Sequence, residues 1–172
     1  MLGINPGRLG AGSTGICFTD TKRCEGDLGI AVAGLRTHEP SSDFFYRAIR
    51  AAGGPKAFYD RVYVQAVCPL GFTRMGPKGT PVNLNYYDDS ALQEAITPVV
   101  VQWLRDLIAT GLRTDVMCCV GTGKNLAFLE KLNAKHGFFG RIVPLEHPRF
   151  VMQYRFKKLD EYVAKYVAAA AL

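Results

Sequence analysis

The pattern that most constrains this chain is an alternation of short apolar segments with longer segments of helical periodicity. The apolar segments span residues 1–4, 61–67, 115–120 and 141–145. Short apolar runs bounded by turn residues are typical of buried strands. The first of them reads as the end of a strand, because the chain starts there.

Segments of helical periodicity separate and follow these strands. Helices are expected at about residues 41–52, 89–110, 125–133 and 154–171. Pro98 is expected either to kink the second helix or to mark its start, because proline lacks a backbone N–H. Residues 73–85 are expected to form a polar loop that carries Arg74 and Lys78.

Strand–helix alternation of this kind predicts an α/β fold. We expect a three-layer α/β/α arrangement around a central, mainly parallel four-stranded sheet, as one domain over residues 1–172. In such sheets ligands bind beyond the carboxyl ends of the strands. The functional site is therefore expected in the loops that follow Ile4, Val67, Val120 and Leu145.

Composition excludes several classes of protein. The formal net charge of +6 favours a polyanionic partner. No apolar run is long enough to span a bilayer, so no membrane partner is expected. The five cysteines form no C-x-x-C pair, which argues against a metal ribbon or a disulfide framework and favours reduced thiols in a cytosol.

Five short motifs lie in these loops, in a fixed order. They are G-I-N-P-G at 3–7, T-G-I-C-F at 14–18, C-P-L at 68–70, G-T-G-K at 121–124 and H-P-R at 147–149. This order resembles the uracil-DNA glycosylase superfamily, and most closely its single-strand-selective monofunctional (SMUG) branch in bacteria. The resemblance covers residues 2–155.

The resemblance implies a monofunctional DNA glycosylase of base-excision repair that uses no metal or cofactor. It implies DNA as partner, preferentially single-stranded, and a monomer in the bacterial cytoplasm, associated with the nucleoid. Relatives carry a further N-terminal helical segment, so this chain is expected to be a single glycosylase domain without it.

The same resemblance assigns roles to individual residues. Asn5 matches the residue whose amide orients the attacking water, and His147 matches the donor of a hydrogen bond to O2 of the leaving base. The backbone around Ile4 matches a second contact to that oxygen. Phe18 matches the aromatic ring that stacks on the extruded base, and Gly7 should leave room for substituents at C5, as in 5-hydroxymethyluracil.

Two positions depart from the resemblance. An asparagine that reads the edge of uracil is replaced by Ala66, with Gln65 beside it, so either backbone groups read that edge or deaminated purines such as hypoxanthine and xanthine are also accepted. The segment after His147 reads as a short loop in place of a longer wedge. Residues expected to contact DNA are Arg8, Lys124, Arg149, Phe150 and Tyr154.

Other interpretations of these residues stay open at this point. Asn5 could be a turn residue before proline, and His147 could cap the end of a strand. Gly10–Gly15 matches G-x-G-x-x-G, which would indicate a nucleotide cofactor, although no strand directly precedes it. A non-catalytic DNA-binding relative is the second alternative. No lysine stands where a Schiff-base nucleophile is expected, so strand cleavage by β-elimination is not expected.

Overall fold

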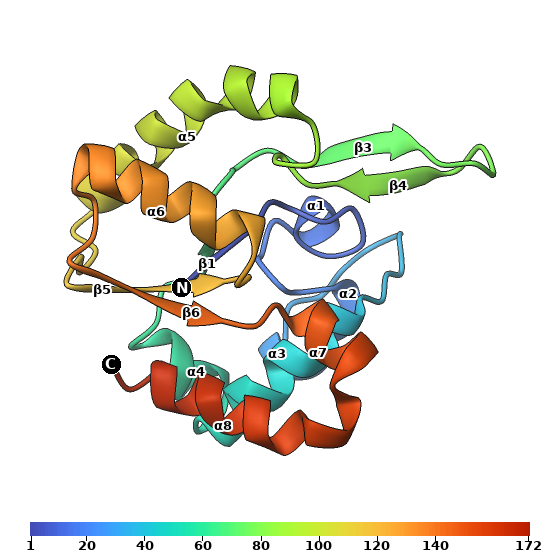
Figure 1. Ribbon diagram of the computed structural model, residues 1–172. Coiled ribbons are helices and arrows are strands. Elements are labelled where there is room, and N and C mark those ends of the chain that lie inside the picture. The colour runs from blue at the N-terminus through green and yellow to red at the C-terminus, as the bar shows by residue number, and fades with distance from the viewer.

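The computed structural model describes all residues, 1–172, and shows a layered α/β molecule (Figure 1). In chain order its elements are β1 (Leu2–Gly3), α1 (Ala11–Thr14), α2 (Thr21–Leu28), α3 (Pro40–Ala51), α4 (Gly54–Tyr59), β2 (Gln65–Ala66), β3 (Phe72–Met75), β4 (Pro81–Leu84), α5 (Ser90–Ala109), β5 (Val116–Val120), α6 (Lys124–His136), β6 (Arg141–Leu145), α7 (Pro148–Tyr154), the 3₁₀ turn η1 (Phe156–Lys158) and α8 (Leu159–Ala169).

The central sheet has four parallel strands in the order β2-β1-β5-β6. The register pairs Leu2 with both Gln65 and Cys119, so the short strand β1 lies in the middle of the sheet. All four strands therefore present their carboxyl ends at one edge, which is the right-hand side in Figure 1. This arrangement confirms the predicted fold class.

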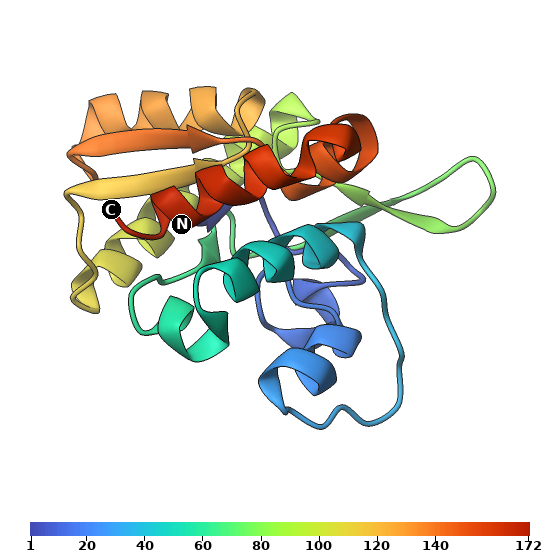
Figure 2. The ribbon, with the colours of Figure 1, turned by 90° about the horizontal axis from the view of Figure 1, so that it is seen from below.

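Two apolar clusters cover the two faces of the sheet. Strand β5 alternates between them: Met117 and Cys119 pack with α5 and α6, whereas Cys118 and Val120 pack with α3, α7 and α8. This period of two is what a strand buried on both faces requires. In Figure 1 helices α5 and α6 lie above the sheet, and α3, α4 and α8 lie below it. Figure 2, seen from below, shows α8 in front of the sheet. The aromatic run 44–46 is fully enclosed in the second cluster.

The strand expected at 61–67 is much shorter, since only Gln65–Ala66 is paired as β2. Its only neighbour is β1, and the first carbonyl that this neighbour offers is that of Met1, which accepts from the Gln65 N–H. The sequence of residues 61–64 has the pattern of a strand, but no neighbouring strand pairs with these residues. Pairing, and not local propensity, decides where this strand begins.

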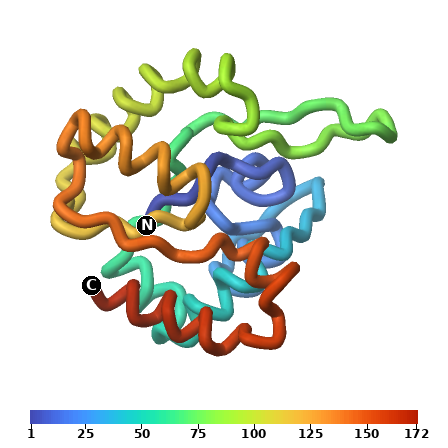
Figure 3. The backbone as a smooth tube through the Cα atoms, in the orientation of Figure 1, coloured from blue at the N-terminus to red at the C-terminus, as the bar shows by residue number.

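The polar loop expected at 73–85 is instead a β-hairpin. Strands β3 and β4 pair antiparallel from Phe72↔Leu84 to Met75↔Pro81, and the hairpin projects from the body of the molecule (Figure 3). Most of its side chains are exposed. Backbone hydrogen bonds and not burial hold the hairpin, so the apolar periodicity that reveals a buried strand is missing from its sequence.

Helix α5 begins at Ser90 and continues through Pro98. Asp89 caps it, because its Oδ1 accepts the Leu92 N–H at 2.8 Å. Pro98 is exposed, so the carbonyl that loses its partner faces solvent. Pro98 is therefore not the start of this helix.

The C-terminal helix expected at 154–171 is also different. The chain forms α7 directly after His147, turns through η1, and only then forms α8. The segment after His147 is thus a helix and not a short loop. Proline at the first position of α7 favours this start, because its missing N–H would have no partner there. The helices α1, α2 and α4 were not predicted.

None of the helices combines the length and apolar character that crossing a membrane would need.

Candidate active site

A cavity of about 340 Å³ opens at the carboxyl edge of the sheet. Its lining comes from five separate segments: the loop after β1, the start of α3, the end of β2, the base of the β3–β4 hairpin, and the start of α7. Nine of the residues expected in the site line this cavity: Ile4, Asn5, Gly7, Phe18, Ala66, His147, Arg149, Phe150 and Tyr154. The tertiary structure thus brings together residues more than 140 positions apart.

The Asn5 side chain is held at both ends of its amide. Its Nδ2 donates to the Leu84 carbonyl at 3.2 Å, and its Oδ1 accepts the Tyr86 N–H at 3.2 Å. Asn5 therefore ties the glycine-rich loop to the end of β4. A carbonyl oxygen has two lone pairs, so Oδ1 keeps one acceptor position for a further donor such as water.

This amide belongs to a longer buried network. The Tyr86 hydroxyl donates to Oδ1 of Asn125 at 2.8 Å, and Asn125 lies fully buried in the first turn of α6. The Asn125 amide in turn faces the carbonyls of Gly3 and Val120 at 3.5 and 3.4 Å. The network therefore links two central strands to the loop that carries Asn5.

His147 stands at the N-terminal cap of α7. Its Nδ1 accepts the Arg149 N–H at 3.2 Å, so the proton of the neutral imidazole resides on Nε2. Burial lowers the pKa of His147 to about 4, and the positive charge of Arg149 acts in the same direction. The cap interpretation and the catalytic interpretation are therefore compatible, because capping uses Nδ1 and leaves the Nε2–H free.

Phe18 is the only non-glycine residue with a positive φ, 54°. A bulky side chain rarely adopts this conformation, which costs about 1–3 kcal/mol and is common at functional sites. One face of the ring stacks on Phe45 at a centroid distance of 4.7 Å, and the ring lies 5.7 Å from that of His147. Its edge lies against Gly3, where a Cβ would come within 2.8 Å of the ring.

Ala66 lines the cavity, but Gln65 does not. The Gln65 side chain is engaged elsewhere, because its Oε1 accepts both the Ala66 N–H at 2.9 Å and the Cys17 thiol at 3.0 Å. Gln65 therefore does not substitute for the missing asparagine. The Ala66 carbonyl accepts from the Trp103 indole at 3.1 Å, and the methyl side chain of Ala66 offers no polar atom to the cavity.

Helix α7 forms an aromatic and basic rim at the mouth of the cavity. Phe150 and Tyr154 are 38% and 61% exposed, and their ring centroids are 5.6 Å apart. The Arg155 guanidinium lies 5.3 Å above the Phe150 ring, and Arg149 is exposed beside it. Exposed aromatic rings among cations are typical of surfaces on which bases stack.

Arg8 and Lys124 do not line the cavity. Both side chains are exposed near its edge. The Arg8 N–H donates to Asn83 at 3.1 Å, and the Lys124 ammonium lies 6.0 Å from the centre of the Tyr87 ring. These two residues are thus available to a ligand that extends beyond the cavity.

Several residues of the lining were not identified from the sequence: Glu39, Ser41, Asn83, Asn85, Tyr87 and Gln153. Asn83, Asn85 and Tyr87 lie at the base of the hairpin, whose strands the sequence did not reveal. Glu39 lies in a stretch without any motif. No pattern in the chain relates it to Asn5, so only the tertiary structure could identify it.

The thiols near the site are not nucleophiles. All five cysteines are buried and unpaired. Burial raises the pKa of Cys17 to about 11 and that of Cys119 to about 12. A thiol with such a pKa is protonated and unreactive near neutral pH.

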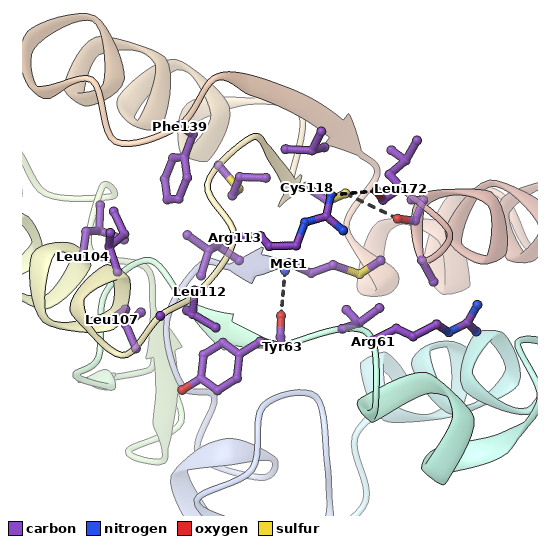
Figure 4. Close-up of a pocket in the computed structure, with 18 residues that line it drawn as sticks. Met1, Arg61, Tyr63, Leu104, Leu107, Leu112, Arg113, Cys118, Phe139 and Leu172 are labelled. Carbon is purple, nitrogen blue, oxygen red and sulfur yellow. Dashed lines mark hydrogen bonds between the residues drawn. The ribbon is translucent and has the colours of Figure 1, made fainter.

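A second cavity of about 240 Å³ lies at the opposite, N-terminal end of the strands (Figure 4). Most of its lining is apolar, including Met1, Leu104, Phe139 and Leu172. Its main charged group, Arg113, already pairs with Asp115 at 2.6 Å. This cavity lacks the convergent polar groups that chemistry requires, so the cavity at the carboxyl edge is the candidate site.

Comparisons with known proteins agree with this geometry. The family model described as the uracil DNA glycosylase superfamily matches residues 1–171. The crystal structure of wild-type SMUG2 from Pedobacter heparinus is similar, with a TM-score of 0.94 and 49% sequence identity over 98% of this chain and 72% of that chain. No match was found among curated protein sequences.

The fold and the family match define the class of protein: the chain belongs to the uracil-DNA glycosylase superfamily. It is a DNA glycosylase, a hydrolase of N-glycosidic bonds that acts in base-excision repair. Within the superfamily it is a bacterial SMUG-like enzyme, as the similarity to Pedobacter heparinus SMUG2 indicates. The resemblance drawn from the five motifs is thereby confirmed, and the nucleotide-cofactor interpretation of Gly10–Gly15 is set aside.

Proposed function

We propose that this enzyme extrudes uracil from DNA, preferentially from single strands, and excises it in the cavity at the carboxyl edge of the sheet. The observation that carries the proposal is that Asn5, Phe18 and His147 line one cavity, although His147 lies more than 120 positions from the other two. The volume of about 340 Å³ lies within the range of small-molecule sites, roughly 300–1,000 Å³.

The reaction breaks the bond between C1′ of the sugar and N1 of the base. The electron pair leaves with the base, so negative charge develops on its O2 and positive charge on the sugar. The Nε2–H of His147 donates a hydrogen bond to O2, and this bond strengthens as the charge develops. A neutral imidazole suits this role, because its proton is fixed on Nε2 by the bond at Nδ1.

Asn5 orients the attacking water through the free lone pair of its Oδ1. An amide is too weak a base to remove the proton, so the rate depends mainly on stabilising the leaving anion. Phe18 stacks on the base through the face that Phe45 does not cover. The backbone around Ile4 provides a second contact to the leaving oxygen.

Binding of the surrounding DNA is assigned to the rim. Phe150 and Tyr154 occupy the gap that the extruded base leaves, and Arg149, Arg8 and Lys124 contact phosphates. Single strands are preferred because extrusion from them costs less unstacking. Without an edge-reading side chain at Ala66, hypoxanthine and xanthine are accepted beside uracil.

Three further properties complete the proposal. The enzyme acts as a monomer, as its resemblance to the SMUG branch implies. It works at the nucleoid in the cytoplasm, where its DNA substrate lies and where five free thiols stay reduced. It cleaves no strand, since no lysine lines the cavity to form a Schiff base.

The test is a single-turnover assay on a single-stranded oligonucleotide with one uracil, followed by hot alkali to cleave abasic sites. Cleavage at the uracil, and none without alkali, is the expected result. The same oligonucleotide with thymine is the control, and a matched duplex measures strand preference. Binding of the oligonucleotide without cleavage would instead identify a non-catalytic relative.

A further inference from the structure

Glu39 places a carboxylate in the wall of the catalytic cavity. It is the only acidic residue of the lining. It occupies the N-terminal cap position of α3 but makes no capping bond through its side chain, and its backbone N–H donates to Asp20 Oδ2 at 2.8 Å. The backbone of Glu39 is therefore held in place, while its carboxylate takes no part in capping the start of α3.

The carboxylate lies against the bare face of the glycine-rich loop. A Cβ added to Gly7 would come within 2.9 Å of Glu39 Oε1, and a Cβ on Gly10 would collide with Oε2. The space that a side chain at Gly7 would occupy is therefore not simply empty. A substituent of the base that points toward Gly7 meets the Glu39 carboxylate.

No donor group of the protein makes a hydrogen bond to this carboxylate, although 53 hydrogen bonds that involve side chains or the N-terminus are present. Burial raises the pKa of Glu39, the charge of Asp20 acts in the same direction, and the charge of Arg149 opposes both. A partly desolvated acceptor without a partner is costly, and a ligand that supplies an O–H or N–H removes this cost.

We propose that Glu39 is a specificity-determining residue that selects 5-substituted uracils carrying a hydrogen-bond donor, such as 5-hydroxymethyluracil, over thymine. This inference rests on the proposed function. With O2 of the base at His147 and its N3–O4 edge at Ala66, the edge that remains for Gly7 and Glu39 is the one that carries C5. A hydroxymethyl group can donate to the carboxylate, whereas a methyl group cannot and also excludes water from it.

This arrangement predicts that the enzyme discriminates against thymine although position 7 is a glycine. Glycine at position 7 alone would admit any small substituent. The half-buried carboxylate against it makes the methyl group of thymine unfavourable, because the methyl group displaces water from this acceptor and offers no donor in its place. Gly7 thus limits the size of the C5 substituent that the cavity accepts, and Glu39 selects for its polarity.

The test compares single-turnover excision of uracil, 5-hydroxymethyluracil and thymine from otherwise identical single strands by the wild type and Glu39→Met. Methionine has nearly the shape of glutamate but no acceptor oxygen. We expect the ratio of 5-hydroxymethyluracil to thymine excision to fall roughly 10- to 100-fold, the range for a hydrogen bond to a charged group. The exposed Glu94 on α5 is the matched control, and Glu94→Met should keep the wild-type ratio.

The outcomes separate the two proposals. If the wild type excises no uracil, the proposed function fails. If it excises uracil but not 5-hydroxymethyluracil, or if Glu39→Met keeps the ratio within about threefold or slows all three bases equally, the inference about Glu39 fails and the proposed function stands. Should Glu39→Met not fold by circular dichroism, Glu39→Gln replaces it; the neutral amide should lower the ratio by a smaller factor, and an unchanged ratio overturns the inference.

Discussion

At the scale of single residues, the two proposed catalytic groups are both tied to the scaffold by hydrogen bonds and both keep some hydrogen-bonding capacity. Asn5 uses Nδ2 and one lone pair of Oδ1 to hold the end of β4, and His147 uses Nδ1 to cap α7. Asn5 keeps the second lone pair of Oδ1 for the attacking water, and His147 keeps its Nε2–H for the leaving base. Substitution of either residue therefore removes both a structural bond and a chemical one, and an experiment has to separate the two.

Asn5→Ala should lower single-turnover excision at least tenfold, because the water loses its acceptor. It should also reduce the free energy of unfolding by about 1–3 kcal/mol through the lost bonds to Leu84 and Tyr86. The matched control is Asn133→Ala on α6, which removes an amide that bridges the N–H and carbonyl of Phe139 far from the cavity. The two variants should lose a similar free energy of unfolding, but only Asn5→Ala should excise uracil slowly. This result would assign the slow rate to the lost water contact and not to the lost stability.

His147→Ala should lower the rate by about 10²–10³, the usual cost of losing a donor to a developing oxyanion. His136 is the last residue of α6 and stacks on Phe138, and it does not line the cavity. The control His136→Ala should therefore keep the normal rate. Wild-type rates in His147→Ala would remove this residue from the mechanism.

The pH dependence follows from the lowered pKa of His147, about 4 in the folded protein against 6.5 for an ordinary histidine. The imidazole is neutral from pH 8 down to about pH 5, so the rate should show no inflection near 6.5 and should fall only toward pH 4. An imidazole that acts as a cation would instead give a rate that rises as the pH drops through 6.5.

Stability should change in the same window. Below pH 6.5 the unfolded chain binds a proton at His147 while the folded protein does not, so the free energy of unfolding falls as the pH drops from 6.5 toward 4. Urea denaturation at pH 7 and pH 5 should show a smaller loss in His147→Gln than in the wild type. Equal losses would mean that His147 is not desolvated.

Ala66→Asn should sharpen the preference for uracil over hypoxanthine and xanthine, because an amide at this edge can pair with N3 and O4 of uracil. Release of the three bases from matched single strands gives the ratio. An identical substrate spectrum would show that position 66 does not face the edge of the base.

At the scale of elements, the β3–β4 hairpin and α7 both contribute to the lining of the cavity, and neither was predicted from the sequence. The hairpin has few buried side chains, so no apolar alternation marks its strands. Helix α7 has only seven residues, of which Pro148 and Val151 are buried. Both elements depend on long-range contacts: Leu84 and Tyr86 on the Asn5 amide, and α7 on its packing against α3.

The rim of α7 gives a prediction of its own. The double substitution Phe150→Ala and Tyr154→Ala should slow excision from duplex DNA more than from single strands. In a duplex the extruded base returns to its place in the stack when no side chain fills the gap, whereas a single strand has no such paired position. Single-turnover rates on matched substrates measure this difference. A loss of equal size on both substrates would argue against filling of the gap.

At the scale of the whole molecule, the net charge of +6 and the basic rim should make binding salt-dependent. Arg149→Gln should reduce the slope of log K against log salt by about 0.7 for a single strand, the value for one phosphate contact. Lys131→Gln, on the outer face of α6, should leave the slope unchanged. An unchanged slope in Arg149→Gln would place this residue away from the phosphates.

The sequence by itself determined the fold class, the central strands and the identity of nine cavity residues. Buried strands such as β5 must be apolar on both faces, and motifs such as G-I-N-P-G and H-P-R keep their residue types and order, so both can be read from one chain. The sequence did not determine where β2 begins, because that depends on the partner that β1 offers.

Only the tertiary structure decided how the cavity is finished. It placed the Glu39 carboxylate against Gly7, turned Gln65 away from the cavity, and left Arg8 and Lys124 outside the lining. The physical reason is that these placements depend on contacts between segments that share no periodicity or spacing. A local pattern encodes what each segment becomes, whereas the packing of the segments decides which polar atom is left free to face the substrate.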